Sequence, residues 1–170
     1  MKFRPKHQIT TILLILLVFG VAISTSIGVY TFPALALDYN QQNLIEADFS
    51  GRDLTDSSFN HANLRSSNLS HTNLQGISLF AASLESANLE GANLANATLD
   101  SARFTKANLT NAVLEGAFAA NARFDGAIID GADFTHVLLR KDQQDKLCKV
   151  AKGTNPTTGR DTRETLFCSS

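Results

Sequence analysis

An apolar residue recurs at every fifth position from Leu44 to Leu139, twenty times without an insertion. We call each of these residues a centre. The residue two positions before a centre is small, and it is Ala eleven times in succession from Ala82 to Ala132. A polar residue usually separates the two, as in Ala87-Asn88-Leu89. The centres are Leu44, Phe49, Leu54, Phe59, Leu64, Leu69, Leu74, Leu79, Leu84, Leu89, Leu94, Leu99, Phe104, Leu109, Leu114, Ala119, Phe124, Ile129, Phe134 and Leu139.

A period of five fits neither an amphipathic helix, at 3.6, nor a strand, at 2. It fits a chain that turns after every short segment and stacks each segment on an earlier one. One such unit is too small to bury its own centre, so burial must come from neighbours above and below. The pattern therefore predicts a solenoid with the centres inside, Ala where space is short, and Asn or Ser at the turns.

The A-[DN]-L-x-x pattern resembles the pentapeptide-repeat family. This resemblance implies an all-β solenoid: a right-handed, quadrilateral β-helix in which four pentapeptides complete one coil. Twenty units would then form about five coils, with a rise of roughly 24 Å. The departures are Arg52 and Ile77, where a small residue is expected, and Ala119, which is a small centre.

The first 36 residues have the features of an export signal. Three basic residues within the first six positions precede an apolar stretch, and Ala34 and Ala36 then form a small-x-small cleavage site. We expect cleavage after Ala36. The alternative is an uncleaved membrane anchor, because residues 9–29 are long enough to span a bilayer. The chain thus divides into a signal peptide (1–36), a pentapeptide-repeat β-helix (37–139) and a tail (140–170).

The sequence of the tail predicts a helical cap. Residues 140–151 are typical of a helix that ends before Gly153, and Asp161 or Thr162 could begin a second short helix that ends near Cys168. Cys148 then lies on the first helix, and in an exported chain we expect it to form a disulfide with Cys168. A cap is needed because a bare β-helix end exposes apolar centres and unpaired strands. With the signal and the repeats, this tail resembles the thylakoid-lumen pentapeptide-repeat proteins of cyanobacteria and plastids, which have no known catalytic residues.

The net charge of the chain argues against one class of function, nucleic-acid binding. The whole chain carries -1, and a nucleic-acid binder would need a basic surface. Without residues 1–36 the charge is -4, divided into -7 for residues 38–139 and +3 for residues 140–170. We therefore expect a β-helix with acidic walls and a basic tail.

We expect no catalytic residue, cofactor or metal. The chain contains no nucleophile elbow, phosphate loop or His-Glu-x-x-His motif. His7, His61, His71 and His136 do not converge under a twenty-residue coil, as metal ligands must, so we interpret them as solvated turn residues.

Two groups of residues are candidates for binding. Arg103 and Arg123 should stack one coil apart and form an anion-facing pair, unless Asp100 and Asp125 neutralise them. The second group occupies the position before the centre, which is polar from Asn43 to Asn108 and often apolar afterwards. Its members form a candidate interaction patch, which either binds a partner or lies under the 140–170 tail: Val113, Phe118, Ile128 and Leu138.

The leading function hypothesis is a non-catalytic scaffold in the thylakoid lumen or periplasm that binds an unidentified protein. It involves no nucleic acid, and it involves a membrane only if the N-terminal segment stays uncleaved. One alternative is a DNA-mimicking gyrase-binding protein, an activity known in the pentapeptide-repeat family; export argues against it, since gyrase is cytoplasmic. A lesser alternative is a lumenal redox-responsive module that uses Cys148 and Cys168.

Overall fold

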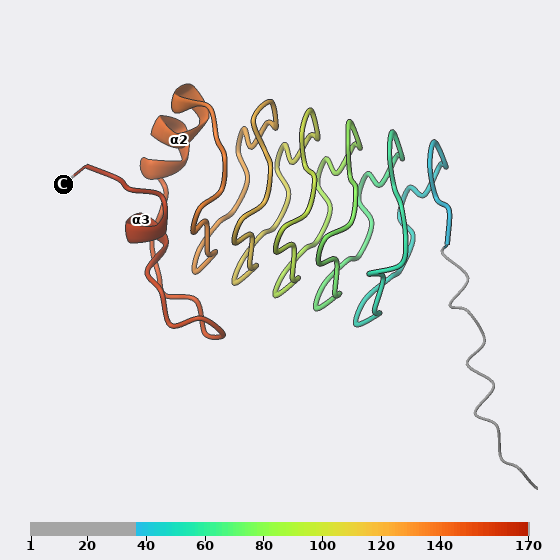
Figure 1. Cartoon of the computed structure of the whole chain (residues 1–170), viewed down its shortest axis with the longest axis horizontal. Helices are drawn as coiled ribbons and strands as arrows, with labels where there is room; N and C mark the ends of the chain where they lie inside the picture. The colour runs from blue at the N-terminus through green and yellow to red at the C-terminus, as the bar shows by residue number, and fades with distance from the viewer. Residues whose placement is uncertain (1–36, 170) are drawn as a thin grey trace, which may run out of the picture. The chain divides into compact units, whose positions relative to one another are not determined.

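The computed structural model describes residues 37–169, which wind into stacked coils followed by two short helices (Figure 1). The helices are α2 (Lys141–Cys148) and α3 (Thr162–Thr165). Neither helix within residues 37–169 has the length and hydrophobicity that crossing a membrane requires. The expected signal peptide, the cleavage site at Ala34 and Ala36, and His7 lie outside the described residues.

Each coil contains twenty residues. Every parallel bridge joins residues twenty positions apart, from Asp38–Ser58 to Phe118–Leu138. Backbone hydrogen bonds hold each coil to both neighbours. The Asn88 N–H donates to the Ser67 carbonyl at 2.9 Å and the Asn88 carbonyl accepts from Leu69 at 2.7 Å, both in the preceding coil, and the Leu89 N–H donates to the Asn108 carbonyl of the following coil at 2.7 Å. Four pentapeptides therefore complete one coil, as the family resemblance implied.

The bridges form four ladders, one on each side of the coils, and we name each side after one of its rungs. The chain passes through the Phe118 face, the Arg103 face, the Asn88 face and the Asn93 face in that order. Their rungs are Asp38, Ser58, Ser78, Thr98, Phe118 and Leu138; Asn43, Asn63, Ser83, Arg103 and Arg123; Asp48, Asn68, Asn88, Asn108 and Ile128; and Asp53, Asn73, Asn93, Val113 and Asp133.

The interior follows the predicted pattern. The centres from Phe49 to Phe134 are buried, and so is the run of Ala two positions before them. Like side chains stack on like across one coil step, as in Phe104 and Phe124, whose rings are parallel at 5.0 Å. Ala fits beside them because the walls of a twenty-residue coil lie too close for two large side chains to meet.

The turns rely on backbone with positive φ. The second residue after most centres has φ between 55° and 71°, the left-handed region that type II turns require. His61, His71 and His136 occupy such positions, which agrees with their interpretation as turn residues. Gly91 leaves room for the His71 ring of the neighbouring coil, because a Cβ there would lie 2.6 Å from Nδ1 of that ring and the ring would have to shift.

The tail completes the hydrogen bonds of the last coil. Elsewhere the N–H of a centre donates to the following coil, but Phe124 donates to the Gln143 side chain at 3.3 Å and Phe134 donates to the Thr165 hydroxyl at 3.1 Å. Asp161 caps α3 as expected, accepting from two backbone N–H groups of that helix. The first helix is shorter than predicted. It ends at Cys148 instead of residue 151, since the chain then turns so that the Lys152 carbonyl accepts from the Gly131 N–H at 2.9 Å.

A polar lock holds the rest of the tail to the coils. The buried Asn155 amide donates to the carbonyls of Asn111, Ala112 and Gly131. Arg160 pairs with the fully buried Asp133 at 3.0 Å. Burial by itself would raise the pKa of Asp133, but hydrogen bonds from the hydroxyl and backbone N–H of Thr135 and the charge of Arg160 together lower it.

Leu94→Ala should lower the free energy of unfolding by about 2–5 kcal/mol, because it removes a fully buried centre and leaves a cavity. Leu138→Ala is the matched control. The same atoms are lost from a side chain that is 54% exposed, so a change within about 0.5 kcal/mol is expected. Urea unfolding followed by circular dichroism measures both. Equal losses would contradict the assignment of Leu94 to the interior and Leu138 to the surface.

Asp133→Asn should destabilise the protein at pH 7 by about 1–3 kcal/mol, since a charge-assisted bond to Arg160 is lost. The lowered pKa of Asp133 means that its contribution is present above the ordinary value of 3.8 and disappears as the pH falls through the lower folded value. The two unfolding curves should therefore converge below about pH 4. Asp56→Asn, at an exposed carboxylate, serves as control. Parallel curves for wild type and Asp133→Asn down to pH 2 would show that Asp133 does not hold the tail through its charge.

Candidate interaction surfaces

The described coils present four outward-facing walls of side chains. Within residues 37–169 no three His, Cys, Asp or Glu side chains gather as metal ligands would. The candidates for a binding surface on these coils are the side chains that line the four faces.

The four residues predicted to form one apolar patch lie on three different faces. Val113 belongs to the Asn93 face and Ile128 to the Asn88 face, whereas Phe118 and Leu138 are successive rungs of the Phe118 face. The prediction of a single patch was wrong because residues five, ten or fifteen positions apart point to different sides of a twenty-residue coil, and only residues twenty apart share a side. Only Phe118 and Leu138 are brought together.

The 140–170 tail does not cover this pair. Phe118 is 45% exposed and Leu138 is 54% exposed, so the alternative that the tail folds over them is wrong. The tail instead returns along the corner between the Asn88 and Asn93 faces, where Asn155 finds its three carbonyl acceptors.

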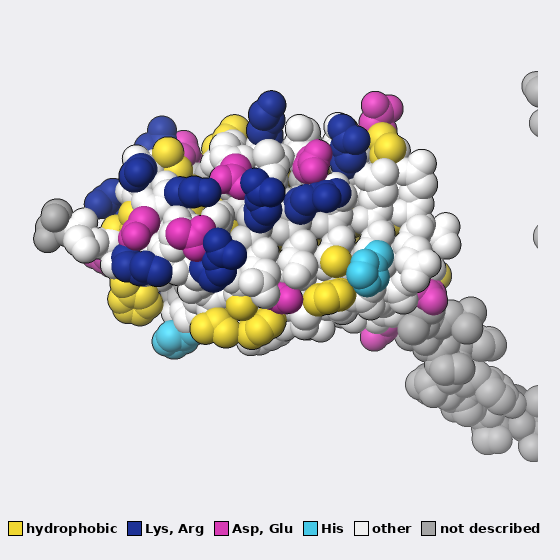
Figure 2. All heavy atoms as spheres, turned by 90° about the horizontal axis from the view of Figure 1, so that it is seen from above, with side chains coloured by type: hydrophobic (Ala, Val, Ile, Leu, Met, Phe, Trp, Pro, Cys, Tyr) yellow, Lys and Arg dark blue, Asp and Glu magenta, His cyan; other side chains and the backbone are white. Residues whose placement is uncertain are grey.

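Phe80 extends the apolar side chains of the Phe118 face toward the N-terminus. It follows the Ser78 rung, is 39% exposed, and lies edge-on to the His61 ring at 5.4 Å. Sequence reasoning treated it as an isolated residue, although spacings close to multiples of twenty could have linked it to Phe118. We call Phe80, Phe118 and Leu138 the apolar row, and Figure 2 shows hydrophobic side chains along this edge of the molecule.

Arg103 and Arg123 are adjacent rungs, as predicted. Each has a carboxylate neighbour, but only one of these was anticipated. Arg123 pairs with Asp125 at 3.1 Å, whereas Arg103 pairs with Glu85 at 3.2 Å. Asp100 accepts hydrogen bonds from Asn121 instead. The difference arises because Glu85 follows the Ser83 rung of the Arg103 face, while Asp100 lies at the corner after the Phe118 face.

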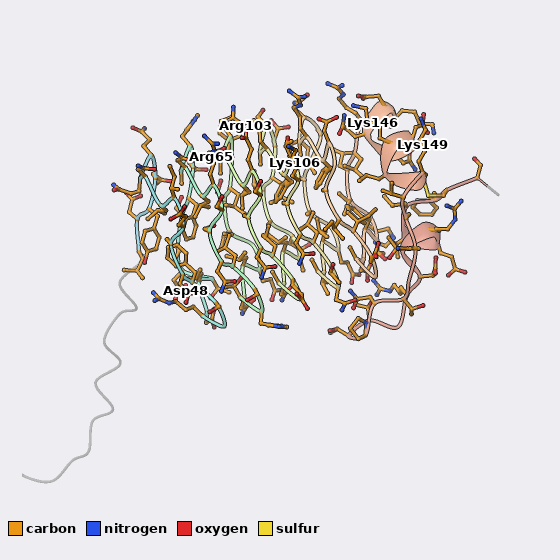
Figure 3. The ribbon with its side chains drawn as sticks, turned by 180° about the vertical axis from the view of Figure 1, so that it is seen from behind. Asp48, Arg65, Arg103, Lys106, Lys146 and Lys149 are labelled. Atoms are coloured by element: carbon orange, nitrogen blue, oxygen red, sulfur yellow. A yellow bond between two sulfur atoms is a disulfide. The ribbon has the colours of Figure 1, made fainter. Side chains whose placement is uncertain are left out.

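Charge is distributed by face, not only by segment. Arg65, Arg103 and Lys106 lie along one edge of the coils and Asp48 lies along the opposite edge (Figure 3). The backbone N–H of Ser50 lowers the pKa of Asp48, and that of Thr55 lowers the pKa of Asp53. These acidic groups belong to the Asn88 and Asn93 faces. The expected acidic walls therefore exist on two faces and are interrupted by a basic one.

A family model for pentapeptide repeats matches residues 43–79, 77–116 and 102–140, which is more than half of the sequence. The chain belongs to the pentapeptide-repeat family.

Two solved pentapeptide-repeat proteins have similar structures. One, from the thylakoid lumen of Arabidopsis thaliana, is 44% identical, with 79% of this chain and 87% of that chain covered and a TM-score of 0.57. The other, from Nostoc PCC 7120, is 31% identical, with 61% and 84% covered and a TM-score of 0.52. The chloroplastic thylakoid lumenal 15 kDa protein 1 of Arabidopsis thaliana is 63% identical over 38 residues, which is 22% of this chain. That match spans only 17% of the relative's length.

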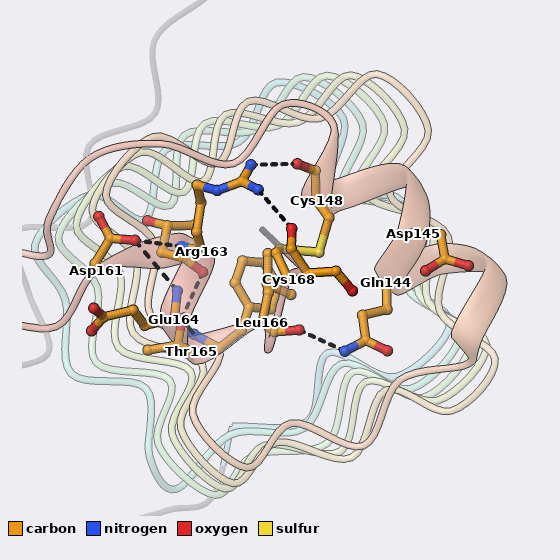
Figure 4. Close-up of a disulfide and its surroundings, with 12 residues drawn as sticks. Gln144, Asp145, Cys148, Asp161, Arg163, Glu164, Thr165, Leu166 and Cys168 are labelled. Atoms are coloured by element: carbon orange, nitrogen blue, oxygen red, sulfur yellow. Dashed lines mark hydrogen bonds between the residues drawn. A yellow bond between two sulfur atoms is a disulfide. The ribbon is translucent and has the colours of Figure 1, made fainter.

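The tail of this pentapeptide-repeat protein contains the expected disulfide between Cys148 and Cys168 (Figure 4). It joins the end of α2 to the segment after α3. Arg163 reinforces the same junction, since its guanidinium donates to the carbonyls of Cys148 at 2.9 Å and Ser169 at 3.3 Å. Gln144 of α2 also donates to the carbonyl of Leu166. The two short helices are therefore tied together by covalent and polar links.

Cys168→Ser should lower the free energy of unfolding by about 3 kcal/mol, because the bond closes a loop with a sequence separation of 20. Reduction of the wild type should have the same effect. Chemical unfolding with and without reductant measures it, and reductant should not change the variant further. A loss much below 1 kcal/mol would mean that the polar links alone hold the helices.

Proposed function

We propose that this protein is a non-catalytic protein-interaction scaffold of the thylakoid lumen. About five coils of a right-handed β-helix would provide its rigid body, and residues 140–169 would cap the C-terminal end. The partner would bind to a side wall, with the apolar row at the centre of the contact.

The lumenal location is supported by two relatives whose names place them there. The export signal expected in residues 1–36 and a disulfide in the tail agree with delivery to an oxidising compartment. The periplasm was the other destination considered from sequence, and both relatives favour the lumen over it.

The non-catalytic role is supported by the construction of the walls. From Ser83 to Asp133 each rung lies between a buried Ala and a buried centre, so the backbone of a wall is held on both sides by hydrogen bonds and from within by packing. Such a wall offers a fixed array of side chains with water on one side. It suits recognition of a partner better than chemistry that requires exclusion of water.

The main observation that supports the proposal is the exposure of the Phe118 side chain. This position is polar on the first four rungs of its ladder, Asp38, Ser58, Ser78 and Thr98, and becomes aromatic on the fifth. Leu138 continues the apolar surface on the sixth rung and is also about half exposed. Exposed apolar side chains on adjacent rungs gain free energy when a partner buries them.

A photo-crosslinking amino acid at Phe118, irradiated in living cells, should link the protein to another polypeptide. The same amino acid at Ser50, which is exposed on the opposite Asn88 face, is the control and should give fewer products. Mass spectrometry identifies the partner. Phe118→Ala combined with Leu138→Ala should abolish its recovery in a pull-down without lowering the unfolding temperature.

Crosslinks from Phe118 that fall only within residues 140–170 would overturn the proposal, since they would make the row an internal contact. Equal products from Phe118 and Ser50 would do the same, because they would indicate random encounters.

A further inference from the structure

The positive charge of the repeat region is concentrated on one side. The Arg103 face and the helix that continues it, α2, carry a strip of cations that we call the basic strip. Figure 2 shows Lys and Arg side chains gathered across this side, and Figure 3 shows five of its members along one edge. The basic strip consists of Arg65, Arg103, Lys106, Arg123, Lys146 and Lys149.

Two carboxylates lie within the strip, and each is shared by two cations. Glu85 lies 3.7 Å from Arg65 and 3.2 Å from Arg103. Asp125 lies 3.1 Å from Arg123 and 2.8 Å from Lys146, and the hydrogen bond from Lys146 lowers the pKa of Asp125. Each trio keeps one uncompensated positive charge.

Lys106 and Lys149 add to this excess. No carboxylate among residues 37–169 lies within 4.0 Å of either ammonium group. With the two trios, the strip therefore carries four more positive than negative charges, although the chain after residue 36 is negative overall. The bridge between Arg103 and Arg123 places the backbones of these two residues on adjacent rungs, about 4.8 Å apart along the ladder, so their positive charges repel each other across one coil step. Such repulsion is relieved when an anion lies across both groups.

An open hollow lies at the end of the strip, between the last coil and α2. Its volume is about 330 Å³, and its lining includes the cations Arg123, Arg140 and Lys146 together with the Gln143 amide. One carboxylate, Asp142, also lines it and pairs with Arg140. The hollow has room for a carboxylate group within reach of several donors.

We propose that the basic strip binds an acidic segment of a partner polypeptide. The planar guanidinium fork matches carboxylates, and Glu85 already occupies such a position between two Arg residues. From Arg65 to Lys146 the strip spans about four coil steps, or roughly 19 Å, which equals about six residues of extended chain. The exposed Arg and Lys would accept carboxylates along this length and in the hollow.

A protein segment fits this surface better than two other anionic surfaces. A membrane contact would be favoured by apolar side chains among the cations, but the rungs that precede Arg103 on its ladder, Asn43, Asn63 and Ser83, are all polar. A second copy of the chain could offer its acidic Asn88 or Asn93 face, but contacts between two different faces build rings or open filaments and not the two-fold dimers that are commonest among soluble oligomers.

The test uses the chain from residue 37 onward and a fluorescein-labelled peptide of six Glu-Ser repeats, followed by fluorescence anisotropy at low salt. A peptide of six Gln-Ser repeats is the ligand control. We expect binding of the Glu peptide only, weakened at least tenfold when salt rises from 0.02 to 0.3 M, as interactions between exposed charges are screened.

Arg103→Glu combined with Arg123→Glu should weaken binding of the Glu peptide at least tenfold. The matched control is Arg52→Glu combined with Lys152→Glu, which changes the net charge equally away from the strip and should alter affinity less than threefold. If charge reversal disturbs folding, as judged by circular dichroism, Arg103→Gln with Arg123→Gln replaces it and should still weaken binding severalfold.

Three results would overturn the proposal. They are equal weakening by the two charge-reversal pairs, binding of the Gln peptide as tightly as the Glu peptide, and binding to vesicles containing 30% phosphatidylglycerol without binding to the Glu peptide. Self-association that depends on Arg103 and Arg123, seen by sedimentation in place of peptide binding, would assign the strip to a second copy.

This inference rests on the proposed scaffold role but concerns a separate face, so the two can fail independently. Phe118→Ala with Leu138→Ala should leave peptide affinity unchanged. Normal crosslinking from Phe118 without peptide binding would contradict only the proposal for the basic strip. Peptide binding without crosslinks would contradict only the proposal for the apolar row.

Discussion

The structure depends on hydrogen bonding between coils in a fixed register of twenty residues. Each rung residue both donates to and accepts from the coil before it, as Asn88 does with Ser67 and Leu69, while the two residues that flank the rung bond in the same way to the coil after it. A slip of one residue would expose the centres and bury the polar rungs, because neighbouring residues of a rung point to opposite sides of the wall. The unbroken series of centres excludes such a slip. Every surface property of the molecule then follows from which residues fall on the same ladder.

This register stacks identical side chains on one another across successive coils. Some of these stacks are favourable and others are repulsive. Asn side chains benefit: Asn63 donates to Asn43 and Asn108 to Asn88, each at 3.1 Å across one coil step. Charged residues do not, because Arg over Arg is repulsive. Glu85 and Asp125 offset this repulsion from turn positions beside the ladder, leaving the ladder itself to the cations. The basic face is thus a consequence of which residues interrupt the polar repeat and of how few carboxylates accompany them.

The sequence alone was sufficient for the period, the identity of the interior residues and the beginning of α3, because each depends on local pattern. The disulfide could also be predicted, since the chain has two cysteines and the expected export signal indicates an oxidising compartment. The distribution of binding residues required the coil. Phe118 and Ile128 look equivalent in the repeat but occupy opposite faces, and the segment charges of the repeat region and the tail concealed a basic face within the acidic region. The ion pairs made by residues at the turns could not be predicted from the sequence either. Arg103 pairs with Glu85 and not with Asp100, and this depends on where the coil places the side chains at its corners. The early end of α2 could not be predicted because it depends on a tertiary hydrogen bond, which the Gly131 N–H donates to the Lys152 carbonyl.

The tail connects the two proposed surfaces to stability. It satisfies the N–H groups of Phe124 and Phe134 that a further coil would have satisfied, and α2 extends the basic strip with Lys146 and Lys149. A tail released from the coils would therefore uncover the apolar end of the β-helix and also remove two cations and one wall of the hollow. The ion pair between Arg160 and Asp133 holds the tail to the coils, whereas the disulfide ties two parts of the tail to each other. Because the apolar row lies on the coils themselves, loss of the tail's attachment should impair the basic strip more than the Phe118 face.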